Sequence, residues 1–235
     1  MKTFLCALLL SGLGLIAPRY CQAAPTRIVC LGDSVTKAVR PGVTVEETFC
    51  ALLQKSLSTA ERPIEVVNAG IGGHTTANGL ARFEKDVLAQ NPTAVVIMFG
   101  LNDSWIDDGK TASRLTVAEY RQNLQTMVKA LKSRGPTVIL MTPNPAIAPK
   151  YGPERNITLR PYVDAVRDLA REERLELVDV YARFAELPLE GIELNSLFTD
   201  AMHPNPSGQK LIADLLAARF RELDWANPKQ AAPQK

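Results

Sequence analysis

Short apolar runs alternate with amphipathic, helix-like segments along almost the whole chain, and this alternation restricts the fold more than any other feature. The runs end in turn-forming residues, as buried strands do. They lie at 28–31, 64–69, 94–99, 137–141 and 175–180. Strands that alternate with helices form a parallel sheet with helices on both faces. We therefore predict an α/β domain built on five parallel strands.

Capping signals predict where the helices between these strands begin. Thr44 with Glu47 and Thr116 with Glu119 have the spacing of a capping box. Asn205 and Pro206 fit the cap and first position of another helix. They predict helices from 44 to about 59, from 116 to a stop at Gly135, and from 205 through 220. Another helix follows Thr75 or Thr76. Four prolines predict a stiff loop over 143–153.

The first 23 residues have the pattern of a secretory signal peptide. Lys2 gives a positive start, 4–16 is mainly apolar, and Ala23 is a small residue that suits a cleavage site. About 13 apolar residues are too few to span a bilayer. We therefore expect a cleaved signal and a secreted or periplasmic chain without stable membrane insertion.

Charge and cysteine content narrow the class of protein. Residues 1–23 contain two cations and no acid, so their removal lowers the formal net charge from +2 to zero. Without a basic excess, we expect no nucleic-acid partner. Cys30 and Cys50 lie in a predicted strand and a predicted helix, and we expect both to be buried thiols. Residues 24–225 suit one domain, followed by a flexible tail at 226–235.

Residues suited to acyl transfer follow the predicted strands, whose carboxyl ends meet at one edge of a parallel sheet. Ser34 follows the first strand. Asp200 precedes His203 by three residues, so a carboxylate could orient an imidazole that accepts the proton of Ser34. The backbone N–H groups of Ser34 and Gly73 and the amide of Asn102 could bind an oxyanion. The pattern predicts a serine nucleophile with a histidine base.

Each of these residues also has a purely structural interpretation. Ser34 could cap a helix, Asp200 could cap a turn, and Asn102 is an ordinary turn residue. The combination favours catalysis, because the only two histidines after residue 23, His74 and His203, both fall in these loops. His74 has no acidic neighbour in the sequence, and we expect it to line the site.

Four blocks of the sequence resemble the SGNH, or GDSL, family of esterases and lipases. They are Gly32-Asp33-Ser34, Asn68-Ala69-Gly70-Ile71-Gly72-Gly73-His74-Thr75, Gly100-Leu101-Asn102-Asp103 and Asp200-Ala201-Met202-His203-Pro204. They occur in the family's order and span nearly all of 24–225. The resemblance departs from familiar members only at Val35 and Leu101, which are packing positions.

This resemblance implies a three-layer, flavodoxin-like fold with strand order 2-1-3-4-5. It implies Ser34 as nucleophile, His203 as base and Asp200 as the acid that orients it. Ser34, Gly73 and Asn102 would then form the oxyanion hole. The family includes esterases, thioesterases and lysophospholipases, and the resemblance implies no cofactor.

Alternative functions fit the sequence less well. Gly70-Ile71-Gly72 follows a strand, but a dinucleotide-binding turn would need a third glycine where Thr75 stands. Gly109-Lys110-Thr111 ends like a phosphate-binding loop, but Ser104 occupies the position of its first glycine. The scattered histidines and cysteines predict no metal site. A binding module that had lost its chemistry would lack a catalytic group, and here none is missing.

The loops at 101–115 and 143–155 should form the walls of the site. Their polar and aromatic residues are Trp105, Asp107, Asp108, Lys110, Asn144, Lys150, Tyr151 and Arg155. We expect His74, Trp105 and Tyr151 to contact the substrate. Polar walls with aromatic rings suit a small acyl group on a sugar-like alcohol, whereas a long acyl chain needs a continuous apolar groove. The sequence thus predicts hydrolysis of short-chain esters, with acyl-thioesterase or lysophospholipase activity as the alternative.

Overall fold

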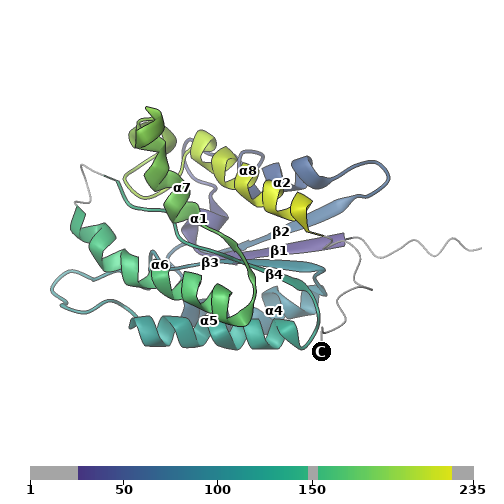
Figure 1. Ribbon diagram of the computed structural model, residues 1–235, viewed down its shortest axis with the longest axis horizontal. Helices are drawn as coiled ribbons and strands as arrows, with labels where there is room; N and C mark the ends of the chain where they lie inside the picture. Colours follow the sequence, from purple (N-terminus) through teal and green to yellow (C-terminus); the bar gives the residue numbers. More distant parts are fainter. Residues whose placement is uncertain (1–25, 148–152, 224–235) are drawn as a thin grey trace, which may run out of the picture.

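The computed structural model describes residues 26–147 and 153–223, which form a parallel sheet between two layers of helices (Figure 1). The strands are β1 (Thr26–Gly32), β2 (Ile64–Gly70), β3 (Ala94–Met98), β4 (Thr137–Met141) and β5 (Glu176–Val178). Their order in the sheet is β2-β1-β3-β4-β5, and every pair is parallel. The predicted fold class and strand order are therefore confirmed.

Helices cover both faces of this sheet. Above it in Figure 1 lie α1 (Ser34–Lys37), α2 (Phe49–Leu57), α7 (Val180–Glu186) and α8 (Pro206–Glu222). The other layer contains α3 (Thr76–Ala81), α4 (Phe83–Asp86), α5 (Val117–Lys132) and α6 (Pro153–Glu173). The short 3₁₀ turns are η1 (Leu88–Gln90), η2 (Leu187–Glu190) and η3 (Leu194–Leu197). Each helical layer packs a separate hydrophobic cluster against its face of the sheet.

The buried parts of the central strands are apolar because both of their faces are covered. Along β1, Ile28 and Cys30 belong to the cluster beneath α2 and α8, whereas Val29 and Leu31 belong to the opposite cluster. All four side chains are fully buried. Successive side chains of a strand point to opposite faces, so a strand between two helical layers has no polar side.

Three predicted boundaries are wrong, for identifiable reasons. The helix expected from residue 44 begins at Phe49, and Thr48 caps it by accepting from the N–H of Ala51. The expected loop 143–153 ends earlier, because Pro153 starts α6. The fifth strand ends at Val178, since Asp179 caps α7 through the N–H of Ala182. In the first and third cases, a local cap sets the boundary.

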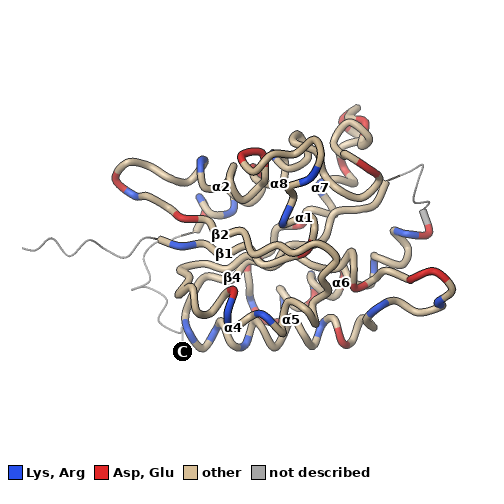
Figure 2. The backbone as a smooth tube through the Cα atoms, turned by 180° about the vertical axis from the view of Figure 1, so that it is seen from behind, with Lys and Arg blue, Asp and Glu red and all other residues tan. Residues whose placement is uncertain are grey.

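Several other expectations can be compared with the described residues. Cys30 and Cys50 are buried free thiols, as predicted. No helix in the described part of the chain is long and apolar enough to cross a membrane. Residues 1–23 and 226–235 lie outside the described residues, so the predicted signal peptide and tail stay predictions. Figure 2 shows lysine and arginine interspersed with aspartate and glutamate along the chain.

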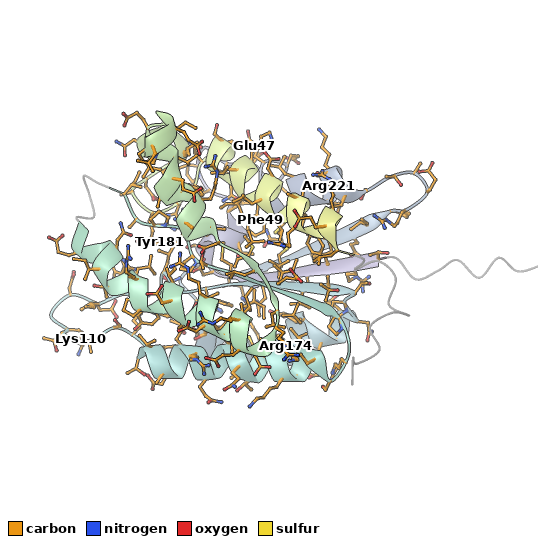
Figure 3. All side chains as sticks on the ribbon, in the orientation of Figure 1. Glu47, Phe49, Lys110, Arg174, Tyr181 and Arg221 are labelled. Carbon is orange, nitrogen blue, oxygen red and sulfur yellow. The ribbon has the colours of Figure 1, made fainter. Side chains whose placement is uncertain are left out.

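The carboxyl ends of the strands lie together at the left edge of Figure 1, where the loop that carries Lys110 also projects (Figure 3). Close packing at this edge requires glycine at two strand ends. A Cβ on Gly70 would lie 2.1 Å from the backbone nitrogen of Lys37, and one on Gly32 would lie 2.6 Å from the carbonyl oxygen of Met98. Gly32 lets the ends of β1 and β3 approach closely, and Gly70 lets the backbone of α1 pack against the end of β2.

Candidate active site

Ser34 is the first residue of α1, directly beyond the end of β1. Asp33 caps this short helix, because its Oδ1 accepts from the N–H of Val35 at 2.9 Å. The alternative in which Ser34 is itself the capping residue is therefore wrong. Its hydroxyl is not used in capping, and the side chain is partly accessible.

A chain of hydrogen bonds connects Ser34 to the loop before α8. The Oγ of Ser34 lies 2.9 Å from Nε2 of His203, across 169 positions of sequence. On the other side of the ring, Nδ1 of His203 lies 2.8 Å from Oδ2 and 3.0 Å from Oδ1 of Asp200. The structure thus brings the three residues together in the predicted order. An imidazole between a hydroxyl and a carboxylate can accept the hydroxyl proton.

Asp200 also organises its own loop. Its Oδ1 accepts from the backbone N–H groups of Met202 and His203, each at 2.8 Å. The turn-capping interpretation and the orienting interpretation of this residue are therefore both correct structurally. The capped turn fixes the position of the carboxylate relative to the imidazole.

The surroundings of this pair favour a neutral imidazole beside an ionised carboxylate. Burial lowers the pKa of His203 below 6.5, and the Arg40 cation lowers it further, against the opposing effect of Asp200. Burial alone would raise the pKa of Asp200, but hydrogen bonds from His203 and from the two backbone N–H groups hold it below 3.8. These shifts favour a neutral imidazole and an ionised carboxylate at neutral pH.

The loop after β2 lies against the nucleophile. A Cβ on Gly72 would come within 3.8 Å of Cβ of Ser34. Gly73 has φ +79°, a conformation that favours glycine. The side-chain nitrogen of Asn102, which follows β3, donates to the carbonyl of His74 at 3.1 Å. Gly73 and Asn102 thus belong to connected loops beside Ser34, and their use as oxyanion donors stays a prediction.

The carboxyl groups of Asp33 and Asp103, next to these loops, are buried. Asp33 is 2% exposed, and burial raises its pKa to about 7, with repulsion from Asp103 adding to the rise. Asp103 is fully buried, and burial raises its pKa as well. Oδ1 of Asp103 accepts from both N and Oγ1 of Thr76, at 2.8 and 2.6 Å. Asp103 therefore fastens the start of α3 to the loop after β3.

The predicted substrate contacts have different surroundings. His74 is partly buried, its Nδ1 has no hydrogen-bond partner among the described residues, and burial lowers its pKa below 6.5. The guanidinium of Arg155 stacks on the half-buried ring of Trp105, 5.2 Å from its centroid, and donates to the carbonyl of Leu101. Tyr151 lies outside the described residues. Substrate contact by all three predicted residues stays a prediction.

Asn144 is not an available wall residue, contrary to expectation. Its side chain is fully buried, and its nitrogen donates to the carbonyls of Pro145 and Met202, both at 2.9 Å. It ties the loop after β4 to the histidine loop. Among the described residues, no cluster of three or more histidines, cysteines or acids is arranged to hold a metal ion.

The parallel sheet has this strand order and carries a paired serine and histidine at its carboxyl edge. The chain is therefore a serine-dependent carboxylic ester hydrolase. More specifically, the chain belongs to the GDSL-like lipase/acylhydrolase family, whose sequence profile matches residues 30–211. The predicted family is thereby confirmed.

Individual relatives support this membership. The chain is 32% identical to an acetylxylan esterase of Geobacillus stearothermophilus, over 86% of this chain and 97% of that protein. It is 31% identical to the esterase TesA of Pseudomonas aeruginosa, over 86% and 92% of the two chains. A crystal structure of a lipase/acylhydrolase from Enterococcus faecalis superposes with a TM-score of 0.70 at 30% identity, over 84% and 96% of the chains.

Sequence reasoning missed two residues beside the site. Arg40 contacts both the turn after Ser34 and Asp200, and the carboxyl of Asp33 lies 3.4 Å from the amide nitrogen of Asn102. Asp33 was visible only as a member of the Gly-Asp-Ser block. A single arginine before Pro41 carries no spacing signal, so Arg40 could be found only from the folded structure.

Proposed function

We propose that this chain is an exported serine esterase that hydrolyses short-chain esters, including O-acetyl groups on carbohydrate. Ser34 acts as nucleophile, His203 as general base and Asp200 as the acid that orients it. The observation that carries this proposal is the continuous hydrogen-bond chain from Oγ of Ser34 through His203 to Asp200, with distances of 2.9 and 2.8 Å.

The reaction then proceeds in two halves. Nε2 of His203 takes the proton as Oγ of Ser34 attacks the ester carbonyl carbon, and a tetrahedral intermediate forms. The intermediate collapses when His203 returns the proton to the departing alcohol, which leaves an acyl group on Ser34. Water, activated by the same imidazole, attacks this acyl group and releases the acid.

The oxyanion of each intermediate needs hydrogen-bond donors fixed before the reaction. The N–H groups of Ser34 and Gly73 and the amide nitrogen of Asn102 supply them. Asn102 is directed by the carbonyl of His74 and the carboxyl of Asp33, which accept from its nitrogen at 3.1 and 3.4 Å. The longer contact is the weaker one, and we expect the oxyanion to compete for that hydrogen.

The small acyl group is supported by the relatives and by the loops. Several similar proteins are named as esterases of acetylated substrates, among them acetylxylan esterases from Geobacillus stearothermophilus and Xylanibacter ruminicola. The loop after β3 carries Trp105, with Arg155 stacked on its ring. An aromatic ring with hydrogen-bonding neighbours suits a sugar ring.

A series of 4-nitrophenyl esters from acetyl to palmitoyl tests the acyl preference. We expect kcat/KM to be highest for the acetyl or another short-chain ester, and acetylated xylooligosaccharides to be deacetylated. A maximum at eight carbons or beyond would contradict this and favour a lipid substrate. Faster turnover of matched thioesters than of oxygen esters would favour the thioesterase alternative.

Replacement of the nucleophile tests the assignment of Ser34. We expect Ser34→Ala to unfold at the same urea concentration as the wild type and to lose about 10⁶-fold in kcat. An organophosphonate should label the wild type at Ser34 and leave Ser34→Ala unmodified. Labelling at any other residue would remove the assignment.

N-terminal sequencing of the exported protein tests the proposed export. The secreted chain should begin at Ala24.

A further inference from the structure

The backbone after Ser34 contains a strained turn. Ala38 has φ 59° and ψ −44°, and the N–H of Val39 donates to the carbonyl of Lys37 at 2.7 Å. These features define a γ-turn whose central residue has a positive φ, which is rare and costly for a residue other than glycine. Such strain persists only where neighbouring contacts hold the backbone in place.

Arg40 supplies these contacts. Its Nε donates to the carbonyl of Ala38 at 3.0 Å, and its Nη2 donates to the carbonyl of Ser34 at 2.9 Å. The backbone of Arg40 is fixed by its pairing with Val43 across a tight turn. The guanidinium therefore joins the strained residue to the nucleophile from a backbone position that is itself constrained.

The same guanidinium faces the acid of the histidine loop. Nη1 of Arg40 lies 3.8 Å from Oδ2 of Asp200, the oxygen nearest to Nδ1 of His203. The Arg40 side chain is 17% exposed, so water screens this ion pair only in part. Arg40 is thus in contact with both halves of the site, which come from opposite ends of the chain.

We propose that Arg40 is a positioning residue, which holds the turn after Ser34 and keeps the Asp200 carboxylate in place behind His203. This inference rests on the roles proposed above for Ser34, His203 and Asp200. A planar guanidinium can address two carbonyls and a carboxylate at once, whereas an ammonium on a flexible stem cannot hold the same three groups. Lysine at this position would preserve the charge but not the geometry.

The charge of Arg40 gives the proposal a measurable signature. The charged groups that face His203 are Asp200, from its own loop, and Arg40, from the turn after α1; Arg40 also faces Asp33. Loss of the cation removes a repulsion from the imidazolium and so raises the pKa of His203. Because the neutral imidazole is the working base, the acid limb of kcat/KM then moves to higher pH.

The test measures kcat and kcat/KM of Arg40→Met, Arg40→Lys and the wild type on 4-nitrophenyl acetate between about pH 4.5 and 9. This range extends about two pH units to either side of a histidine pKa. Arg40→Met should lower kcat by about 10²-fold, the cost of slight misplacement of reacting groups, and move the acid limb upward. Arg40→Lys should lower kcat but leave the limb where the wild type has it. Arg219→Met is the control, because Arg219 also forms ion pairs, with Glu176 and Glu222, away from these contacts; it should behave as the wild type.

Wild-type kcat in folded Arg40→Met overturns the proposal, and so does a lower kcat with an unmoved acid limb, which would indicate a purely structural role. If Arg40→Met does not fold, Arg40→Gln takes its place, because glutamine also removes the charge; wild-type kcat or an unmoved acid limb in that variant overturns the proposal. Turnover by Ser34→Ala would instead overturn the proposed function. Inactive Ser34→Ala beside fully active Arg40→Met would refute the role of Arg40 alone.

Discussion

The carboxyl groups around Ser34 occupy two opposite environments. On the side of β1 and β3, Asp33 and Asp103 are buried, and desolvation raises the pKa of each. On the side of α8, the Asp200 side chain is 44% exposed, and hydrogen bonds from His203 and the loop backbone outweigh desolvation and lower its pKa. The environments of these three acids thus shift their pKa values in opposite directions.

This difference suits two different roles, an ionised acid beside the imidazole and hydrogen-bond acceptors that connect the loops. A carboxylate that stabilises an imidazolium has to remain ionised throughout the reaction, and Asp200 is the acid among these three whose pKa is lowered. A full negative charge beside the proposed oxyanion donors would oppose the negative charge that develops there. Asp33 and Asp103 instead accept hydrogen bonds that connect the loops.

Among substitutions of these acids, the largest effect on kcat should come from Asp200. Asp200→Asn keeps the size of the side chain but removes the charge and favours the wrong tautomer of His203. We expect kcat to fall by about 10⁴-fold, with little change in the urea midpoint because asparagine keeps an oxygen that can accept from the N–H groups of Met202 and His203. Steady-state kinetics and urea unfolding of the same preparation measure both quantities. A loss below tenfold would show that another acid orients His203.

Asp33→Asn should alter the pH dependence of stability. A carboxyl whose pKa rises from 3.8 to about 7 on folding contributes stability at low pH that is lost as the pH rises through that range. The difference corresponds to at most about 4 kcal/mol. Asparagine caps helices as well as aspartate. The free energy of unfolding of the variant, relative to that of the wild type, should therefore rise between pH 4 and pH 8, near the two ends of the titration.

The sign of this effect is opposite to that of Asp200, whose contribution to stability is lost as the pH falls. Urea unfolding of Asp33→Asn and wild type at several pH values measures the difference. An unchanged difference in stability across the range would mean that Asp33 keeps an ordinary pKa in the folded protein.

Asp103→Ala should reduce stability more than it reduces chemistry. The change leaves the N–H and hydroxyl of Thr76 without their acceptor. We expect a loss of about 3 kcal/mol in the free energy of unfolding, and a smaller decrease in kcat than for Asp200→Asn. Asp103→Asn is the matched control, because it keeps an acceptor oxygen and should lose less. Equal losses in both variants would indicate that the charge matters more than the hydrogen bonds.

The fold was predictable because the apolar runs of β1, β3 and β4 are unbroken and their separating segments carry clear helix signals. Thr116 and Glu119 form the predicted capping box, and Asn205 caps α8 as predicted. The false start at Thr44 has a physical origin, since its N–H does bond to Glu47 but without a helix behind it. Local capping geometry can form where tertiary packing starts the helix later.

The site was predictable only where chemistry follows strand ends directly. Ser34, His203 and Asp200 could be placed because the order of parallel strands brings their loops together. Asn144 could not, since an asparagine in a loop gives no sign that it will be buried. The ion pair of Arg40 depends on the side-chain positions of two loops that are remote in sequence, and no spacing within one sequence encodes such a contact.

The 169 positions that separate Ser34 from His203 also matter for how the protein is made. The strand that leads to Ser34 is synthesised well before the segment that contains Asp200 and His203. The two ends are joined in the folded chain, where the N–H of Phe49 in α2 donates to Oε1 of Gln209 in α8 at 2.9 Å. A nascent chain that ends before residue 200 therefore contains Ser34 without the histidine proposed as its base. Ester hydrolysis can begin only when the whole domain has folded, so enzyme activity during refolding reports the completion of the native state.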